Sequence, residues 1–238
     1  LEYFGFRQPE THQFPKISFG NWVGGDRDGH PLVTSNITRL TLKKLRLNAF
    51  ELIKKHLTDL AENLSLYVEK KDTSRIFQRK YSELLCELQN SNGVQIAIYP
   101  KEVFKTFTYL LLEKLPIDLS LEHALALDDN DISYRNSKQL MEDLRVLQNE
   151  LIRYDAVWLA KNDVAAVIRL IEVFGFHLAK LDIRQNSTFY ESAIDEILRI
   201  STLKKSPYSQ LSEDQRIAFI LDELKNNRPF IWSGDLLK

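Results

Sequence analysis

Two short segments carry charged residues in patterns that an ordinary helix or turn does not need. In the first, within residues 19–31, the paired glycines Gly24 and Gly25 are followed directly by Asp26, Arg27 and Asp28. Paired glycines let the backbone approach a ligand closely or adopt a positive φ angle. The Arg27 side chain is a planar donor suited to a phosphate or a carboxylate, and the two flanking carboxylates could orient it. We therefore treat this loop as a candidate anion site.

The spacing excludes two common loops at this position. A phosphate-binding loop needs Gly-Lys-Ser or Gly-Lys-Thr after its glycines, whereas Asp26 follows Gly25. A calcium loop needs a third oxygen ligand before its glycine and a distant glutamate, and residues 26–29 supply neither. A solvated turn whose aspartates accept hydrogen bonds from backbone amides stays open as the simpler alternative.

The second segment is residues 176–185, whose alternating pattern predicts a strand. Lys180, Asp182 and Arg184 share one face of this strand, and the opposite face is apolar. A strand among helices normally buries aliphatic side chains on both faces, and an isolated buried charge is very costly. The pattern is typical of the mouth of an α/β barrel, where strands end and loops gather. An edge strand with one solvated face explains the same spacing equally well.

Other reactive side chains have simpler interpretations. The five histidines show no metal-ligand spacing, so the sequence predicts no metal site. We expect His177, on the apolar face of the predicted strand, to be a packed core residue. Cys86 is interpreted as a small hydrophobic residue on a leucine-rich helix face. Lysine pairs such as Lys43-Lys44 are typical of solvated helix faces.

Composition limits the class of protein. The chain has 238 residues, 44% hydrophobic and 27% charged, so it can bury a core and is not disordered. Its formal net charge of -1 excludes the basic surface of a protein whose main partner is nucleic acid. A single cysteine excludes an internal disulfide and fits a reducing compartment, and no apolar run is long enough to span a membrane. Because the chain opens on Leu1 rather than Met, we expect it to be cut from a longer protein.

Hydrophobic periodicity predicts a mainly α fold, a single mostly helical region over residues 1–238 with two or three short strands. Residues 1–34 are expected to be loop and strand, 35–174 helical, 176–185 a strand and 187–225 helical again. The expected helices are 37–64, 73–90, 103–115, 140–154, 164–174 with Asn162-Asp163 as its cap, and two that open with capping-box patterns at Thr188 and Ser212.

Taken together, the two charged segments resemble the phosphoenolpyruvate carboxylase family. That family carries a Gly-Asn/Ser-Trp-x-Gly-Gly-Asp-Arg-Asp-Gly-Asn-Pro-x-Val-Thr loop, and residues 20–34 match it except that His30 replaces Asn. It also carries Phe-Gly-x-x-Leu-x-x-Leu-Asp-Ile-Arg-Gln-x-Ser, which residues 174–187 match, with Asn186 where Glu is usual. The order of the two motifs and the helical stretch between them also agree.

The resemblance implies a cytoplasmic, usually homotetrameric enzyme that adds bicarbonate to phosphoenolpyruvate, using Mg²⁺ or Mn²⁺, and yields oxaloacetate and phosphate. The family fold is an eight-stranded β-barrel surrounded by many helices. This chain would then be a helical bundle fragment of an α/β barrel enzyme, and we expect neither a nucleic acid nor a membrane partner.

The resemblance also assigns roles by position. Arg184 would be the catalytic arginine that faces the substrate phosphate or the carboxyphosphate formed from it. Trp22 would line the substrate pocket and Arg27 would shape the anion site. The carboxylates of Asp26, Asp28 and Asp182 would orient the site rather than react.

Several family motifs do not occur in this chain. These are the Thr-Ala-His-Pro-Thr segment with the catalytic histidine, the metal-binding carboxylates, the Lys-Asp-Ala-Gly loop and the Gly-Arg-Gly-Gly loop. We therefore expect an internal slice of the enzyme, inactive by itself and without its own Mg²⁺ site, the metal ligands lying outside it.

Two alternatives stay open. The first is a non-enzymatic helical interaction module, which predicts a solvated Lys180, Asp182 and Arg184 face and an apolar groove between helices. The second is a hydrolase that uses Asp26 and Asp28 as paired carboxylates. It is weaker, because residues two apart on one short loop rarely straddle a bond as an acid and a base must.

Overall fold

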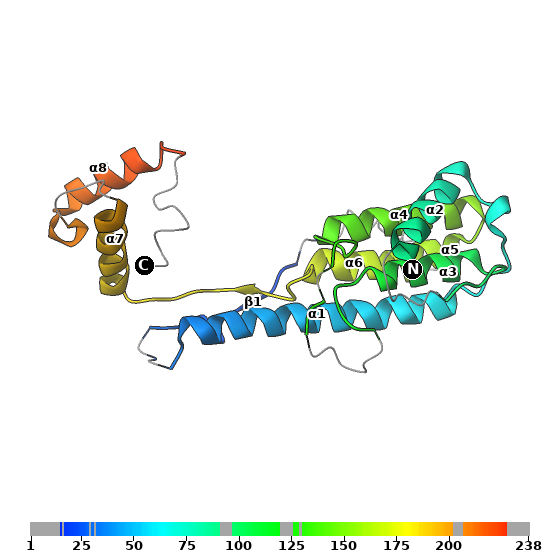
Figure 1. The fold of residues 1–238 in the computed structure, drawn as a ribbon, viewed down its shortest axis with the longest axis horizontal. Coiled ribbons are helices and arrows are strands. Elements are labelled where there is room, and N and C mark those ends of the chain that lie inside the picture. The colour runs from blue at the N-terminus through cyan, green and yellow to red at the C-terminus, as the bar shows by residue number, and fades with distance from the viewer. Residues whose placement is uncertain are drawn as a thin grey trace, which may run out of the picture. The chain divides into compact units, whose positions relative to one another are not determined.

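The computed structural model describes residues 15, 17–28, 30, 32–90, 97–119, 126–128, 130–201 and 207–227. Residues 1–14 of the predicted loop and strand region therefore lie outside the described residues. The chain divides into two compact units (Figure 1). The first unit comprises Leu1–Asn21 and Ile37–Leu181, and the second comprises Trp22–Asn36 and Asp182–Lys238.

The first unit is helical, as the hydrophobic periodicity predicts. Its long helix α1 runs over Ser35–Asn63, which confirms the helix predicted over 37–64. The first two residues of α1 belong to the second unit. The next three predicted helices are also present, within three residues at each end. The elements that follow α1 are η3 (Lys70–Asp72), α2 (Arg75–Gln89), α3 (Val103–Glu113), α4 (Ser137–Arg153), α5 (Val157–Leu159), η4 (Ala160–Val164) and α6 (Ala165–Phe174).

The helical segment before Gly175 begins earlier than the sequence predicts. Asn162 and Asp163 do not cap α6, because they lie inside the π-helical turn η4, which continues directly into α6. The chain leaves α4 through Asp155, a non-glycine residue with φ of 63°. The helical run from Val157 to Phe174 is therefore one continuous segment with a local change in hydrogen bonding.

One hydrophobic core joins α1, α2, α3, α4 and α6. Its aromatic centre is Phe77 of α2, whose ring centroid lies 4.7 Å from that of Phe107 and 5.6 Å from that of Phe104 on α3. Phe50 of α1 belongs to the same core, and its ring centroid lies 4.7 Å from that of Phe176. The face of α1 that the 3.6-residue period selects is the buried one, since Phe50, Ile53, Leu57 and Leu60 are all covered.

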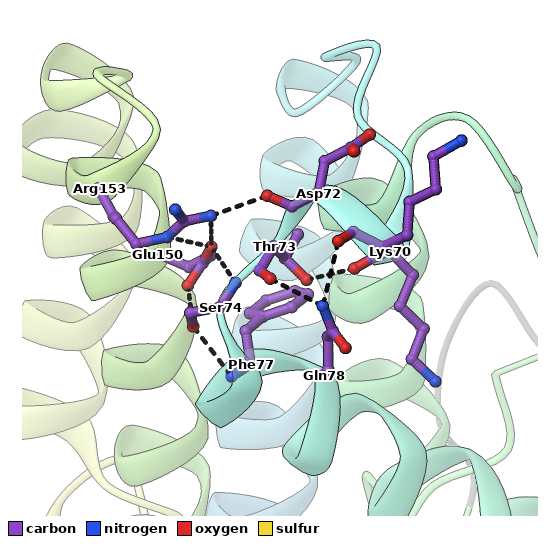
Figure 2. A network of polar contacts seen from close by, with 9 residues as sticks. Lys70, Asp72, Thr73, Ser74, Phe77, Gln78, Glu150 and Arg153 are labelled. Atoms are coloured by element: carbon purple, nitrogen blue, oxygen red, sulfur yellow. Dashed lines mark hydrogen bonds and ion pairs between the residues drawn. The ribbon is translucent and has the colours of Figure 1, made fainter.

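A buried carboxylate ties α4 to the start of α2 (Figure 2). Glu150 is 3% exposed, and its Oε1 accepts a 2.9 Å hydrogen bond from the Ser74 backbone N–H. The Ser74 hydroxyl donates to Glu150 Oε2 and accepts from the Phe77 N–H, so Ser74 is also the N-cap of α2. Arg153 completes the network, with Nε 2.8 Å from Glu150 Oε1 and Nη2 2.9 Å from the Asp72 carbonyl oxygen. These contacts fix α4 against the start of α2, although the two helices are far apart in sequence.

The only sheet among the described residues has two short parallel strands, β1 (Gly20–Asn21) and β2 (Lys180–Leu181). Gly20 pairs with Lys180 and Asn21 with Leu181. The predicted strand over 176–185 is wrong in length, because Leu178 has φ of 63° and its N–H donates to the Phe174 carbonyl oxygen. Regular strand alternation therefore begins only at Lys180. Gly175 ends α6 as expected, with φ of 54°.

The second unit contains α7 (Ser187–Ser201), η5 (Tyr208–Gln210) and α8 (Glu213–Glu223). The capping box at Ser212 is confirmed, with both of its hydrogen bonds to and from Gln215. The capping box predicted at Thr188 is wrong: Asn186 Oδ1 accepts hydrogen bonds from the Thr188 N–H and hydroxyl instead. Arg216 of α8 bonds Glu191 of α7 at 2.5 Å, which fastens the two helices to each other.

The described helices include none that combines the length and the low charge needed to cross a membrane.

Candidate functional site

The two charged segments meet inside the second unit. An isolated parallel bridge pairs Asp26 with Arg184. The Arg27 N–H donates to the Arg184 carbonyl oxygen at 2.9 Å, and the Arg184 N–H donates to the Gly25 carbonyl oxygen at 3.0 Å. The backbone therefore pairs Asp26 with Arg184 and places Arg27 directly after this pair, although the helices of the first unit separate the two segments in sequence.

The paired glycines form the turn that makes this bridge possible. The N–H groups of Gly25 and Asp26 both donate to the Trp22 carbonyl oxygen, at 2.9 and 3.0 Å. Gly24 has φ of 81°, a conformation that a residue with a Cβ rarely adopts, and both glycines are buried. The turn returns the chain so that Trp22 precedes it and Arg27 follows it beside Arg184.

Trp22 and Arg184 are in direct contact. The guanidinium carbon of Arg184 lies 4.9 Å from the centroid of the Trp22 ring, which is a cation–π geometry. Trp22 is 57% exposed and Arg184 is also exposed. In the described part of the chain the Arg184 guanidinium has no hydrogen bond or ion pair, so its N–H donors can meet an anion.

Arg27 occupies a more enclosed position than Arg184. It is half-buried, and its Nε atom is covered by the surrounding protein. Because its backbone is held by the bridge, the side chain starts from a fixed point next to Arg184. The structure therefore places an exposed guanidinium, that of Arg184, against the Trp22 ring, and the backbone of a half-buried arginine, Arg27, next to Arg184.

The three carboxylates expected to orient the site, those of Asp26, Asp28 and Asp182, make few contacts among the described residues. Asp26 Oδ1 accepts a 3.2 Å hydrogen bond from the Asp28 N–H, so this carboxylate supports the loop itself. Asp28 and Asp182 are exposed, and within the described ranges their carboxylates have no hydrogen bond or ion pair. The local hydrogen bond of Asp26 is the feature that the simpler turn interpretation predicts. Whether these carboxylates orient the arginines stays a prediction.

The structure corrects the expectations for two other residues. His177, expected in the core, is exposed, because the left-handed conformation of Leu178 breaks the strand alternation that would have turned it inward. Cys86 is also exposed on α2, beside the buried Leu84 and Leu88 rather than among them. Over the described ranges, no three or more His, Cys, Asp or Glu side chains gather in a cluster that could hold a metal ion.

Comparison with known proteins agrees with the two motifs. The family model for phosphoenolpyruvate carboxylase matches residues 2–235. The chain is 32% identical over 237 residues to a phosphoenolpyruvate carboxylase of Nostoc sp., with 97% of this chain and 22% of that protein covered. It is 31% identical to the Actinobacillus pleuropneumoniae enzyme, with 90% of this chain and 22% of that protein covered. It is 30% identical to the one of Bradyrhizobium diazoefficiens, at 92% and 23% coverage.

The chain thus spans only about a fifth of the length of these curated relatives. The family model nevertheless matches nearly every residue, including both charged segments. The chain belongs to the phosphoenolpyruvate carboxylase family.

Proposed function

We propose that this chain is an internal part of a phosphoenolpyruvate carboxylase and contributes two arginines and a tryptophan to its active site. The whole enzyme would add bicarbonate to phosphoenolpyruvate and release oxaloacetate and phosphate. The observation that carries this proposal is the backbone bridge that joins the Arg27 and Arg184 segments and sets Trp22 against the Arg184 guanidinium.

The chemistry of the reaction explains why such a site is useful. Phosphoryl transfer to bicarbonate brings several anionic oxygens close together, and fixed guanidinium groups lower the barrier by stabilising that charge. Arg184 has donors free for a phosphate or carboxyphosphate, and the Trp22 ring restricts where its guanidinium can lie. Arg27, held on the neighbouring backbone, would add a second positive charge to the same anion site.

We also propose that the divalent metal of the family, Mg²⁺ or Mn²⁺, is held by residues outside this chain. The described residues contain no cluster of three potential ligands, so no step of the chemistry is assigned to a metal here. A homotetrameric state, a cytoplasmic location, and substrate contacts made by the missing family motifs belong to the same proposal.

Lys180, Asp182 and Arg184 are exposed, which is what the alternative interpretation, a helical interaction module, predicts. The relatives are more than four times longer than the region they share with this chain, so their remaining length offers a physical reason for this open face. Two short parallel strands also argue for a larger sheet, since parallel strands normally occur in sheets covered on both faces.

The direct test is substitution of Arg184 in a carboxylase that contains this chain. Arg184→Gln removes the charge while keeping part of the side-chain length. It should lower kcat/KM by about 10²–10³-fold, the loss typical of one donor to a developing anion. Arg199→Gln is the matched control, because Arg199 is an exposed arginine of the same unit that pairs with Glu196. An Arg184→Gln enzyme with unchanged kcat/KM would contradict the proposal.

The 238-residue chain by itself should form no oxaloacetate from phosphoenolpyruvate and bicarbonate. An assay that couples oxaloacetate reduction to NADH oxidation measures this, with added Mg²⁺ and with added Mn²⁺. Steady oxaloacetate production that depends on Arg184 would show that the chain carries a complete site.

A further inference from the structure

The first unit contains a basic cavity that lies outside the site described above. Its volume is about 1460 Å³. Its walls come from the residues before β1, the first half of α1, the start of α4, the end of α6 and β2. We define the basic cavity by its six cationic lining residues, which are Arg39, Lys43, Arg46, Lys138, Arg169 and Lys180.

The charges that line this cavity are strongly unbalanced. Glu172 is the one carboxylate among the described lining residues. It already pairs with Arg169 at 3.3 Å and with Arg145 at 4.0 Å. Arg169 also donates to the Pro15 carbonyl oxygen, so its guanidinium is engaged. The single carboxylate among the described lining residues is therefore already paired with two arginines and does not neutralise the other cations.

Four of the cations have no such compensation. Within the described residues, the side chains of Arg39, Lys43, Lys138 and Lys180 form no ion pair and no hydrogen bond. Like charges around one cavity repel each other, and an anion in the middle would turn that repulsion into attraction. Lys138 stands in the first turn of the 17-residue helix α4, whose N-terminal dipole adds to the positive potential. Ser137, the first residue of α4, also lines the cavity.

The rest of the cavity wall is mostly apolar. Phe19 and Phe174 stack with ring centroids 5.4 Å apart and ring planes within 8°. Leu42 and Met141 also line the cavity. Phe19 and Leu42 are 48% and 49% exposed, so these apolar groups are open to a ligand. A bare inorganic ion would leave this surface in water.

We propose that the basic cavity binds an organic anion that carries at least two negative charges and an apolar or aromatic portion. The anionic group would meet Lys43, Lys138 and Lys180, and the apolar portion would pack on Phe19 and Leu42. The inference does not rest on the function proposed above, because Trp22, Arg27 and Arg184 belong to the other unit and none of them lines this cavity. The sequence did not predict this cavity, because Lys43 belongs to the pair Lys43-Lys44 and such pairs are typical of solvated helix faces.

Phenyl phosphate is the probe that tests both halves of this proposal. In phosphate-free buffer of low ionic strength, isothermal titration of the chain should give a dissociation constant below about 1 mM. Inorganic phosphate should bind about tenfold more weakly, because it lacks the ring. Phenol should not bind measurably, because it lacks the charge. Absence of phenyl phosphate binding, or equal binding of phenyl phosphate and phenol, would overturn the proposal.

Two double variants locate the binding. Lys43→Gln with Lys180→Gln should weaken phenyl phosphate binding about tenfold or more, since two charged contacts to the phosphate are lost. Lys44→Gln with Lys55→Gln is the matched control: it removes the same charge from exposed lysines of α1 that do not line the cavity, and should leave the affinity within about twofold. An equal loss in both doubles would show unspecific attraction and overturn the site.

One further variant separates this site from the proposed active site. Arg184→Gln should leave unchanged the phenyl phosphate binding that depends on Lys43 and Lys180. Loss of that binding in Arg184→Gln would show that the ligand binds in the other unit and would overturn the proposal. The dependence on Lys43 and Lys180 should persist in a longer carboxylase that contains this chain. Its disappearance there would show that protein rather than a ligand fills the cavity, and would also overturn the proposal.

Discussion

The Arg184 guanidinium carbon lies 4.9 Å from the centroid of the Trp22 ring, although most of the helical first unit separates the two residues in sequence. The contact exists because the Trp22–Asp26 turn and the chain at Arg184 share backbone hydrogen bonds. A flexible arginine is thereby restricted to a small region before any substrate arrives. Such preorganisation is what electrostatic stabilisation of a developing anion requires.

Removing the ring of Trp22 should therefore weaken catalysis without removing a charge. In a carboxylase that contains this chain, Trp22→Ala should lower kcat/KM by about 2- to 30-fold, which corresponds to a cation–π contribution of about 0.5–2 kcal/mol. Trp22→Phe should retain most of the activity, because it keeps an aromatic face. Trp158→Ala is the control, since Trp158 is an exposed tryptophan on α5. Equal losses in Trp22→Ala and Trp158→Ala would argue against a specific role for the ring.

The buried carboxylate of Glu150 should be a main polar support of the first unit. Glu150→Gln keeps an acceptor for the Ser74 N–H but loses the charge opposite Arg153 and disturbs the hydroxyl contact (Figure 2). We expect the free energy of unfolding to fall by about 1–3 kcal/mol, measured by urea denaturation. Glu196→Gln, which removes a carboxylate from an exposed pair with Arg199, should have no measurable effect. A Glu150→Gln protein as stable as the original would contradict the structural role.

The same residue should make stability depend on pH in the acid range. Burial alone would raise the pKa of Glu150, but hydrogen bonds from Arg153 and Ser74 outweigh it and lower the pKa below its ordinary value of 4.5. A carboxyl whose folded-state pKa is depressed stabilises the fold above its unfolded pKa, and this contribution is lost as the pH falls through the folded value. The free energy of unfolding should therefore decrease below pH 4.5 more steeply in the original protein than in Glu150→Gln. Parallel curves for the two proteins would refute this assignment.

Gly175 should be difficult to replace, although there is room for a side chain. A Cβ atom at this position would meet no atom within 4 Å, so packing does not forbid alanine. The backbone conformation disfavours alanine, because φ of 54° with ψ of -148° is a conformation that residues with a Cβ rarely adopt. Gly175→Ala should lower the free energy of unfolding by about 1–3 kcal/mol.

Gly20→Ala is the matched control for Gly175→Ala. Gly20 lies in β1 and is not among the glycines with positive φ. Its substitution should change the free energy of unfolding far less, which thermal or urea denaturation of both variants can establish. A larger loss at Gly20 than at Gly175 would show that backbone conformation is not what limits position 175.

The residues alone determined the helical character of this chain and its family. Long runs such as 37–64 and 140–154 bury one face at a 3.6-residue period, and this local signal survives in the structure. The sequence also predicted the capping box at Ser212 and the end of α6 at Gly175, because each of these features depends on a few neighbouring residues. The motifs around Arg27 and Arg184 were sufficient to predict the carboxylase family, which the family match confirms.

Only the tertiary structure decided which distant side chains meet. The strand over 176–185 shrank to Lys180–Leu181, because the backbone at Leu178 takes a left-handed conformation that no alternation of residue types reveals. Likewise, Arg39, Lys43, Lys138 and Lys180 surround one cavity although three different elements supply them. Periodicity reports which face of an element is buried, whereas the partners of that face depend on contacts between segments far apart in the chain.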